Sequence, residues 1–573
     1  MTLTAVQETL DSLRQFGDLP ALESSDSKVT YKELADAIDK LAARLSNEPT
    51  IGPGAHVLVS SRHVPQTIVI MLACVKANVA YVPVPPDAPE TRVEKICSLV
   101  QPAAYLQADG ATVNIDLLGL AQGFAPENRD DILAILHTSG STGTPKSVLI
   151  EHSNLDHFML WCRQVLPLTR EDRVAVLSPL HFDLCTHDIF HGLHAGATLV
   201  IPDEHERTHP GTAGRLIATR GITRIYMVPT FLERVATSLV RSGLRPRHVR
   251  CVMFAGERLT LQGRTAVEEA FPRATLHNLY GPIETNVVTA LELQRGAEHD
   301  SSEVGRALPG VELGIRHPDG TISTEGRGEL TISGPAVTPG YLDELHNAQK
   351  FIVAPTGERT YRTGDEATLS PDGVYLHGRL DSMVKIRGQR VELDEIEAVL
   401  LRHDAVDEGG VVLSSGGDEL HAFIVLNPDR NLDASIAALV EHCRAHLPAV
   451  AVPGRIRTLA QMPVTGTGKI DRQSLKGLLA QEIADEIPPA LTVANTDPER
   501  AIEEMLSARL QSSAEDLRAL SNLREHPAFN SLIAAQVVEA VEDLLDCSAD
   551  YDRFTARSFD SITSMGELFV HRA

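Results

Sequence analysis

Short apolar runs alternate with amphipathic segments through the first 290 residues of the chain. Aliphatic side chains at 34, 38, 41 and 45 recur every three or four residues, which predicts a helix with one buried face. Mainly apolar runs of four to six residues predict buried strands. These strands are expected at residues 56–60, 173–177, 198–201, 224–228 and 249–254. Strands that alternate with helices indicate an α/β fold with largely parallel sheets.

The pattern changes after residue 300, and the changes divide the chain. Residues 300–380 carry short β-rich runs between glycine and proline turns, whereas residues 382–480 alternate helix and strand patterns again. Pro488-Pro489 indicates a linker, and residues 490–573 hold 15 acidic residues, 7 arginines and no lysine. We therefore expect three units: a large N-terminal domain of mixed sheets with a β-rich subdomain (1–380), a small α+β domain (381–485) and a small all-α helical domain (490–573).

Composition and charge narrow the class of partner. A formal net charge of −25 argues against nucleic acid or an anionic membrane as the partner. No apolar run reaches the length of a membrane span, and the first residues lack the basic start and apolar core of a signal peptide. The seven cysteines form no metal-like pairs, which is typical of free thiols in a reducing compartment. We expect a cytoplasmic protein.

The loop between two apolar runs, residues 138–146, carries the clearest chemical signal. Every residue from 138 to 144 is a glycine or bears a hydroxyl group, and Pro145-Lys146 follows. Glycines let a backbone approach a polyphosphate closely, while amide, hydroxyl and lysine groups supply donors. The competing interpretation is a surface hairpin turn. The spacing excludes a Walker loop and a dinucleotide fingerprint. The expected phosphate ligands are Thr138, Ser139, Gly140, Ser141, Thr142, Gly143 and Lys146.

Four later stretches share the polar character of this loop. They are residues 278–285, which include Tyr280 and Glu284; residues 361–365, which end in Asp365; residues 378–392, which include Arg379 and Lys385; and residues 463–472, which include Lys469. Each has a simpler explanation in isolation. Asp365 can cap a turn, Glu284 can cap a helix, and Lys469 can be a solvated lysine.

In this order, the stretches resemble the motifs of the adenylate-forming superfamily, and above all the adenylation domains of nonribosomal peptide synthetases. The resemblance spans about residues 25–480. It is carried by residues 76–83, the loop at 138–146, Phe182-Asp183-Leu184-Cys185, residues 280–284, 328–330 and 361–365, Arg387-Gly388 and Gly468-Lys469. The resemblance implies a mobile small domain and two half-reactions. A carboxylate first attacks the α-phosphate of Mg-ATP, and a phosphopantetheine thiol then takes the acyl group.

The resemblance also implies roles for individual residues. Lys469 bridges the substrate carboxylate and the α-phosphate, and Glu284 holds Mg²⁺. The loop at 138–146 binds the β- and γ-phosphates, although its Lys146-Ser147 departs from the family's usual Lys-Gly. Tyr280, Asp365 and Arg379 contact the nucleoside. Asp381 is the hinge about which the small domain turns, exchanging Lys469 for the face that carries Lys385.

A pocket for the activated acid follows from the same resemblance. Asp183 matches the family's aspartate that pairs with a substrate α-ammonium, and a pairing inside the protein, for instance with His187, is the alternative. The remaining pocket positions are Leu184, His187, Tyr226, Met253, Ala255, Leu279, Val287 and Val288. This largely apolar set resembles the pockets of standalone prolyl adenylation enzymes. Proline is the leading candidate substrate, followed by alanine or valine. An acyl-CoA synthetase and a non-catalytic scaffold are the competing classes.

The acidic C-terminal segment resembles an acyl or peptidyl carrier domain. Ser531 opens an amphipathic, acidic helix, and by the resemblance it would carry phosphopantetheine. Carriers usually have aspartate or histidine before this serine, and here it is Asn530. A degenerate carrier or a docking segment is the alternative. Ser561 is a second match with only 12 residues after it. The carrier protein that receives the acyl group can therefore be in cis or in trans.

Overall fold

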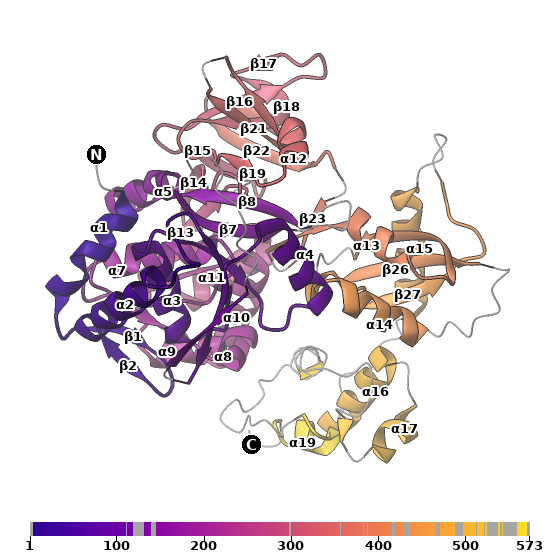
Figure 1. The fold of residues 1–573 in the computed structure, drawn as a ribbon. Coiled ribbons are helices and arrows are strands. Elements are labelled where there is room, and N and C mark those ends of the chain that lie inside the picture. Colours follow the sequence, from indigo (N-terminus) through magenta and orange to yellow (C-terminus); the bar gives the residue numbers. More distant parts are fainter. Residues whose placement is uncertain are drawn as a thin grey trace.

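A computed structural model gives the fold of the chain (Figure 1). It describes residues 4–569 except 111, 119–130, 139–144, 297–299, 356, 382, 387, 415, 416, 418, 428–435, 465–469, 487–496, 511, 512, 521, 524–536, 539, 540 and 542–558. Within the described residues, no helix is long and apolar enough to cross a membrane. Six of the seven cysteines are described, and all six are free thiols.

Seven strands form the first sheet of the N-terminal domain, in the order β19-β8-β7-β4-β3-β5-β6. They are β3 (His56–Ser60), β4 (Ala80–Val84), β5 (Ala104–Asp109), β6 (Thr112–Leu117), β7 (Ile132–Thr138), β8 (Lys146–Glu151) and β19 (Gly340–Tyr341). Both β3 and β4 are buried along their whole length, which explains their mainly apolar sequences. Strands β7 and β8 are antiparallel and flank residues 139–144 of the predicted phosphate loop.

Fifteen strands form the second sheet, which continues from the N-terminal domain into the β-rich part. Its order is β17-β16-β18-β21-β22-β15-β14-β13-β12-β11-β9-β10-β1-β2, with β20 paired to β21. The strands are β1 (Pro20–Glu23), β2 (Lys28–Thr30), β9 (Arg173–Ala175), β10 (Thr198–Val200), β11 (Arg224–Met227), β12 (Cys251–Ala255), β13 (Thr275–Tyr280), β14 (Thr289–Leu293), β15 (Glu303–Ala307), β16 (Glu312–Arg316), β17 (Ile322–Ser323), β18 (Gly326–Ser333), β20 (Phe351–Val353), β21 (Arg359–Ser370) and β22 (Gly373–Arg379). Pairing is parallel from β1 through β10, β9, β11 and β12 to β13, and antiparallel beyond.

Helices cover these sheets and bury two apolar cores. The larger core takes side chains from both sheets, and the second lies between the parallel strands and α9, α10 and α11. The helices of this domain are α1 (Ala5–Ser12), α2 (Tyr31–Ser46), α3 (Pro65–Lys76), α4 (Glu90–Val100), α5 (His152–Val165), α6 (Leu184–Thr186), α7 (Gly192–His194), α8 (Glu204–Thr208), α9 (Pro210–Thr219), α10 (Pro229–Arg241), α11 (Leu261–Ala270) and α12 (Glu344–Lys350). A 3₁₀ turn spans Leu13–Phe16, and a π-helical turn spans His187–His191.

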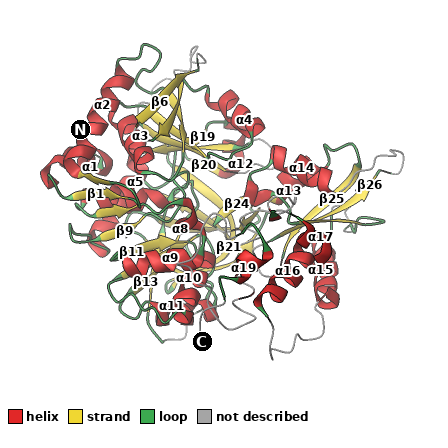
Figure 2. Cartoon of the chain, turned by 90° about the horizontal axis from the view of Figure 1, so that it is seen from below, coloured by secondary structure: helices red, strands yellow, loops and turns green. Residues whose placement is uncertain are grey.

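Two smaller units follow, and both views show them beside the large domain (Figures 1 and 2). The α+β unit contains β23 (Met383–Ile386), β24 (Gln389–Glu392), α13 (Leu393–Leu400), β25 (Val406–Leu413), β26 (Leu420–Leu426), α14 (Ile436–His446), a 3₁₀ turn (Ala449–Ala451), β27 (Arg455–Thr458) and α15 (Arg472–Glu486). The C-terminal unit contains α16 (Pro498–Leu510), α17 (Ala514–Ala519) and α19 (Ile562–Gly566), packed on a core of their own. The three-part fold class predicted from sequence is confirmed.

Candidate active site

Two adjoining cavities lie at one edge of the second sheet. Ala255 and Tyr280 are the last residues of β12 and β13, so both stand at the carboxyl ends of parallel strands. In open α/β sheets, this edge is where ligands bind. The smaller cavity, here called the inner cavity, measures about 150 Å³, and the outer cavity about 740 Å³. Gly256, Asp365 and Lys385 line both.

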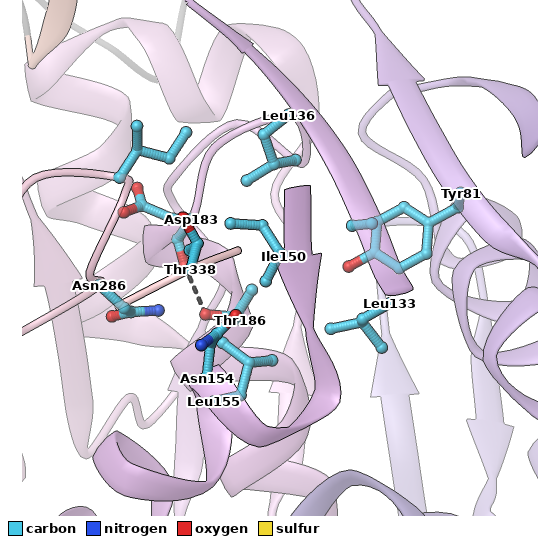
Figure 3. Close-up of a pocket in the computed structure, with 12 residues that line it drawn as sticks. Tyr81, Leu133, Leu136, Ile150, Asn154, Leu155, Asp183, Thr186, Asn286 and Thr338 are labelled. Carbon is cyan, nitrogen blue, oxygen red and sulfur yellow. Dashed lines mark hydrogen bonds between the residues drawn. The ribbon is translucent and has the colours of Figure 1, made fainter. Parts of the chain in front are cut away.

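Asp183 lines the inner cavity from the turn between β9 and α6. Figure 3 shows it beside Thr186, Asn286 and Thr338, and the Thr186 hydroxyl donates to the Asp183 backbone carbonyl at 2.5 Å. Burial raises the pKa of Asp183 to about 6, although the positive charge of Lys385 acts against this shift. A carboxylate in such surroundings is stabilised by a bound cation. The inner cavity is therefore suited to a ligand with a positive group next to Asp183.

The predicted pocket positions fall into two sets: those that line the inner cavity and those that do not. Leu184, Tyr226, Ala255 and Val287 line it together with Asp183. Leu279 lines the outer cavity instead. The side chains of His187, Met253 and Val288 are fully buried and line neither described cavity. Motif alignment placed these three residues on the pocket surface, whereas the structure places them in the packing layer behind it.

Three predicted nucleoside contacts from separate stretches meet beside the outer cavity. The Tyr280 hydroxyl donates to Asp365 Oδ2 at 2.6 Å, and Arg379 Nη1 donates to Asp365 Oδ1 at 2.8 Å. Arg379 also binds Asp381 through Nη2 at 2.6 Å, and Lys350 lies 3.4 Å from the same carboxylate. The outer cavity has the volume of a typical ligand pocket. Asp365, which is predicted to anchor the ribose, and Asp381, the predicted hinge residue, are thus joined through one guanidinium.

Glu284 is buried at the phosphate side of the site. Its Oε1 accepts hydrogen bonds from the Tyr341 hydroxyl at 2.5 Å and from Arg390 Nη1 at 3.0 Å. Burial alone raises the pKa of Glu284, but the charge of Arg390 and the Tyr341 bond hold it below its ordinary value. Among the described residues, Glu284 Oε2 is buried with no hydrogen-bond partner. An ionised carboxylate with one oxygen left over fits a hard cation such as Mg²⁺.

Lys146 faces the small unit at the same side. Its ammonium group lies 3.0 Å from Glu392 Oε1, and both side chains are buried, with exposed fractions of 8% and 6%. Arg390, two residues before Glu392, binds Glu284 as described above. The β23–β24 hairpin of the small unit therefore meets both groups expected to hold Mg-pyrophosphate. Arg390 supplies a positive charge to Glu284, and Glu392 supplies a negative charge to Lys146.

The hairpin also brings Lys385 and Gly388 into the site. Lys385 lines both cavities, and burial lowers its pKa even though Asp365 opposes the shift. The backbone N–H of Gly388 donates to Glu257 Oε1 at 2.7 Å. Gly388 has a φ of +76°, and an added Cβ would lie 2.2 Å from Val228 Cγ1. Only glycine fits this approach, so the small unit presents its 385–388 face to the large domain, as the resemblance implies for thiol transfer.

Several predicted site residues lie outside the described residues. They are Ser139, Gly140, Ser141, Thr142, Gly143, Lys469 and Ser531. Their neighbours on either side are described. Thr138 lines the inner cavity, and Val464 and Ile470, which flank the segment of Lys469, form an isolated antiparallel bridge. The residues that sequence reasoning missed are Glu257, Arg390 and Glu392. The alternating charges of residues 390–392 were visible, but their partners lie far away in the chain.

Comparison with known proteins decides the family. The profile described as AMP-binding enzyme matches residues 10–342, and the AMP-binding enzyme C-terminal domain matches residues 395–469. The chain belongs to the AMP-binding enzymes. It is therefore a member of the adenylate-forming superfamily. Its relatives include adenylation domains of nonribosomal peptide synthetases.

Individual relatives differ in how much of their length they share with this chain. Tyrocidine synthase 3 of Brevibacillus parabrevis is 30% identical over 80% of the chain, but the chain spans only 7% of that protein. D-alanine–D-alanyl carrier protein ligase of Staphylococcus aureus (strain Newman) is 28% identical over 82% of the chain and 98% of the ligase.

Two solved structures have the same fold. The Vibrio cholerae adenylation domain AlmE, in complex with glycyl-adenosine-5′-phosphate, has a TM-score of 0.73 at 25% identity and covers 84% of this chain and 98% of its own. Holo-PA1221, a nonribosomal peptide synthetase protein with adenylation and carrier domains, has a TM-score of 0.77 at 22% identity. It covers 99% of this chain and 96% of its own, so the likeness in fold extends over all three units.

Proposed function

We infer that this chain is an AMP-forming ligase that activates an amino acid and loads it onto the phosphopantetheine thiol of a carrier protein. The observation that carries this proposal is Asp183, a buried carboxylate that lines the inner cavity with a pKa raised to about 6. A substrate α-ammonium in salt-bridge contact compensates the cost of ionising that carboxylate. Two relatives support an amino acid substrate, since one is named for D-alanine and another was solved with a glycyl adenylate.

The first half-reaction requires charge neutralisation at the phosphates. A substrate carboxylate oxygen attacks the α-phosphorus of ATP, the bond to the β-phosphate oxygen breaks, and pyrophosphate leaves. Lys146 and Thr138 contact the leaving phosphates, and Lys469 bridges the reacting carboxylate and the α-phosphate. One such aimed donor is worth about 3–4 kcal/mol in the transition state. Mg²⁺, when bound at Glu284, adds neutralising charge to the phosphates.

The second half-reaction uses the contacts of the β23–β24 hairpin with Lys146 and Glu284. After pyrophosphate departs, Glu392 becomes the partner of Lys146, and Arg390 becomes the partner of Glu284. The two charged groups of the large domain thus remain paired when their ligands leave, which favours docking of the hairpin. The carrier thiol then attacks the acyl carbon, a thioester bond forms, and AMP leaves as the thiol proton passes to solvent.

The inner cavity favours a small, uncharged side chain. Leu184, Tyr226, Ala255 and Val287 form an uncharged part of its lining, which also includes charged residues such as Asp365 and Lys385. An acidic or basic side chain packed against the uncharged residues would be left without a partner, at a cost of several kcal/mol. L-Proline, with a compact apolar ring, is the proposed substrate. A small aliphatic amino acid such as alanine is the second candidate, and the D-alanine relative favours it.

A pair of isosteres tests the amino acid proposal against an acyl-CoA synthetase. Tetrahydrofuran-2-carboxylate has the ring shape of proline but an oxygen in place of the cationic nitrogen. We expect proline to support ATP–pyrophosphate exchange and the oxygen analogue to support at least 100-fold less, because Asp183 is then left without a cation. Equal exchange with both acids would contradict the role of Asp183 and favour an acyl-CoA synthetase.

Ser531 is the proposed phosphopantetheine attachment site, and the chain offers a matched control. Ser561, which the sequence also suggested, accepts a hydrogen bond from Ser564 N at 3.0 Å and caps α19. The full chain is incubated with coenzyme A and a phosphopantetheinyl transferase and measured by intact-mass spectrometry. We expect one added phosphopantetheine in wild type and in Ser561→Ala, and none in Ser531→Ala. An unmodified wild type would refute the assignment and leave loading in trans, and modification that survives Ser531→Ala would place the attachment at another residue.

A further inference from the structure

Three potential metal ligands meet in the packing layer behind the inner cavity. Cys162 comes from α5, and His187 and His191 come from the π-helical turn. One ligand atom of each residue lies within 4.8 Å of those of the other two. All three side chains are buried, with exposed fractions of at most 1%. The cluster lies outside the groups that handle ATP, and nothing in the adenylation chemistry uses Cys162 or His191.

The spacing of the two imidazoles suits a tetrahedral ion. His187 Nε2 and His191 Nδ1 are 3.2 Å apart. Two nitrogen ligands at zinc distances of about 2.0–2.1 Å on adjacent corners of a tetrahedron are separated by about 3.3 Å. A hydrogen bond between the rings explains the same distance without an ion. That bond, however, leaves the position of the Cys162 thiol beside both rings unexplained.

Asp188 contacts His187 from the side away from His191, where it would be a second-sphere partner of a bound metal ion. Its Oδ1 lies 3.1 Å from His187 Nδ1, so His187 donates from Nδ1 and keeps a lone pair on Nε2, toward His191. A carboxylate behind a histidine in this way is the usual second partner of a metal-bound imidazole. Among the described residues, Asp188 Oδ2 is buried with no hydrogen-bond partner. An unpaired buried carboxylate oxygen needs a compensating charge nearby.

The charges of the cluster would agree with a divalent cation. Neutral imidazoles and a thiolate are the forms that bind a metal ion. The Cys162 thiolate and the Asp188 carboxylate would match the two charges of the ion. Arg224 lies nearby, and its guanidinium donates to the carbonyls of Leu166 and Pro167 at 2.6 and 3.1 Å.

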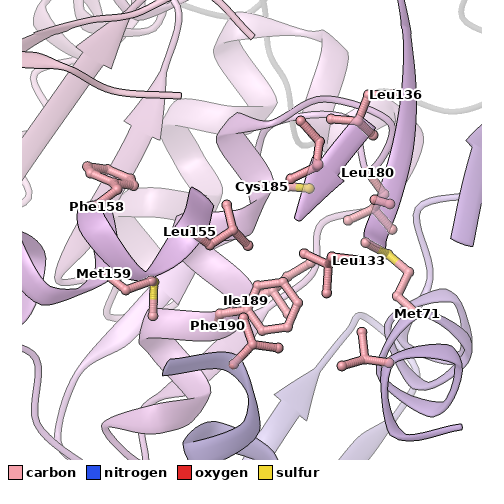
Figure 4. Close-up of a cluster of buried hydrophobic side chains, with 14 of the residues drawn as sticks. Met71, Leu133, Leu136, Leu155, Phe158, Met159, Leu180, Cys185, Ile189 and Phe190 are labelled. Atoms are coloured by element: carbon pink, nitrogen blue, oxygen red, sulfur yellow. The ribbon is translucent and has the colours of Figure 1, made fainter. Parts of the chain in front are cut away.

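The surroundings exclude water and are rigid. Figure 4 shows Phe158 and Met159 of α5 beside Ile189 and Phe190 of the π-helical turn, and all four are buried. The His187 ring also lies edge-on to Tyr226, with ring centroids 5.7 Å apart, and Tyr226 lines the inner cavity. Any ligand that fixes His187 therefore also fixes the wall of the substrate pocket.

We propose that Cys162, His187 and His191 bind a structural Zn²⁺ ion behind the substrate pocket. Binding replaces the thiol proton of Cys162, which passes to solvent, and forms the sulfur–zinc bond. The ion locks α5 to the π-helical turn and holds Tyr226 through His187. Mixed Cys/His sets of this kind are typical of zinc.

The test uses the full chain, without a histidine tag, produced in zinc-supplemented medium and dialysed. Elemental analysis is expected to find one zinc per chain in wild type and in the control Cys74→Ala, whose cysteine is equally buried but outside the cluster. Cys162→Ala and His191→Gln are each expected to lose most of the zinc. Cobalt(II) added to the metal-depleted wild type is expected to give a thiolate-to-cobalt charge-transfer band, which is absent in Cys162→Ala.

Two results would overturn the proposal. The first is a wild-type chain that contains no zinc and gives no cobalt–thiolate band, which is decisive even if the variants fail to fold. The second is Cys162→Ala retaining as much zinc as Cys74→Ala, which would place any bound metal elsewhere. A chelator is also expected to lower the thermal midpoint of wild type and Cys74→Ala while leaving that of Cys162→Ala unchanged.

Discussion

Replacing Asp183 by asparagine is expected to stabilise the fold while abolishing activity. The pKa of Asp183 is about 6 in the folded protein and 3.8 in the unfolded reference, so ionising the carboxylate costs more in the folded state. One pKa unit corresponds to about 1.36 kcal/mol, which gives about 3 kcal/mol of instability at neutral pH. Because a buried amide also has a desolvation cost, we expect Asp183→Asn to gain about 1–3 kcal/mol in free energy of unfolding.

The gain in free energy of unfolding depends on pH, and the raised pKa of Asp183 sets the direction of that dependence. Below pH 4, the carboxylate is protonated in both states, so it contributes nothing. The gain grows between about pH 4 and pH 6 and stays constant above, because the unfolded chain then ionises fully while the folded chain resists. Trp161 is the only tryptophan and lies buried on α5, so its fluorescence in urea follows the large domain.

Asp172 supplies a control of opposite sign. Burial raises its pKa, but hydrogen bonds from Thr223 and Arg250 outweigh this and hold the pKa below its ordinary value. Asp172→Asn is therefore expected to lower stability at pH 7, with a difference that shrinks on acidification. An Asp183→Asn variant that is less stable than wild type at pH 7, or whose gain is the same at pH 4 and pH 7, would refute the reasoning. So would a variant that retains amino acid-dependent pyrophosphate exchange.

Two further substitutions separate the two half-reactions, and a third tests the packing of the large domain. Glu392→Gln removes the buried partner of Lys146, so transfer to the carrier should slow at least 10-fold while pyrophosphate exchange persists, and equal losses in both assays would contradict the pairing. Gly388→Ala places a Cβ 2.2 Å from a valine methyl, so single-turnover thiol transfer should fall while exchange is retained. Gly281→Ala places a Cβ 1.7 Å from the Asn286 carbonyl oxygen, so stability should fall by about 2 kcal/mol or more in urea, and an unchanged midpoint would contradict the close packing.

Much of the fold could be predicted from local sequence patterns, because the signal for a single strand or helix lies within a short stretch of the chain. The mainly apolar runs at residues 56–60 and 249–254 predict buried strands, and they form β3 and most of β12. The convergence of Tyr280, Asp365 and Arg379 could be expected from ordered motifs, and the structure joins them by hydrogen bonds. Each of these motifs can be recognised from its own residues. The motifs could therefore be assigned to one site without predicting how the chain brings them together.

Long-range pairing was beyond the sequence patterns. Lys146 and Glu392 are 246 positions apart, and nothing in either segment indicates the other. The cysteines showed no metal-like spacing, yet Cys162 meets His187 and His191 because a helix and a π-helical turn pack together. Motif alignment also could not tell that His187 and Met253 lie behind the cavity wall, since that depends on side-chain direction.

ATP–pyrophosphate exchange across the proteinogenic amino acids tests the central claim most directly. It reports the first half-reaction alone and needs neither the carrier nor the position of the small unit after adenylation. We predict exchange that depends on an added amino acid, is highest with L-proline, and is lost in Asp183→Asn. Exchange no higher with proline than with alanine would contradict the proposed substrate. Exchange that no amino acid stimulates would contradict amino acid activation itself.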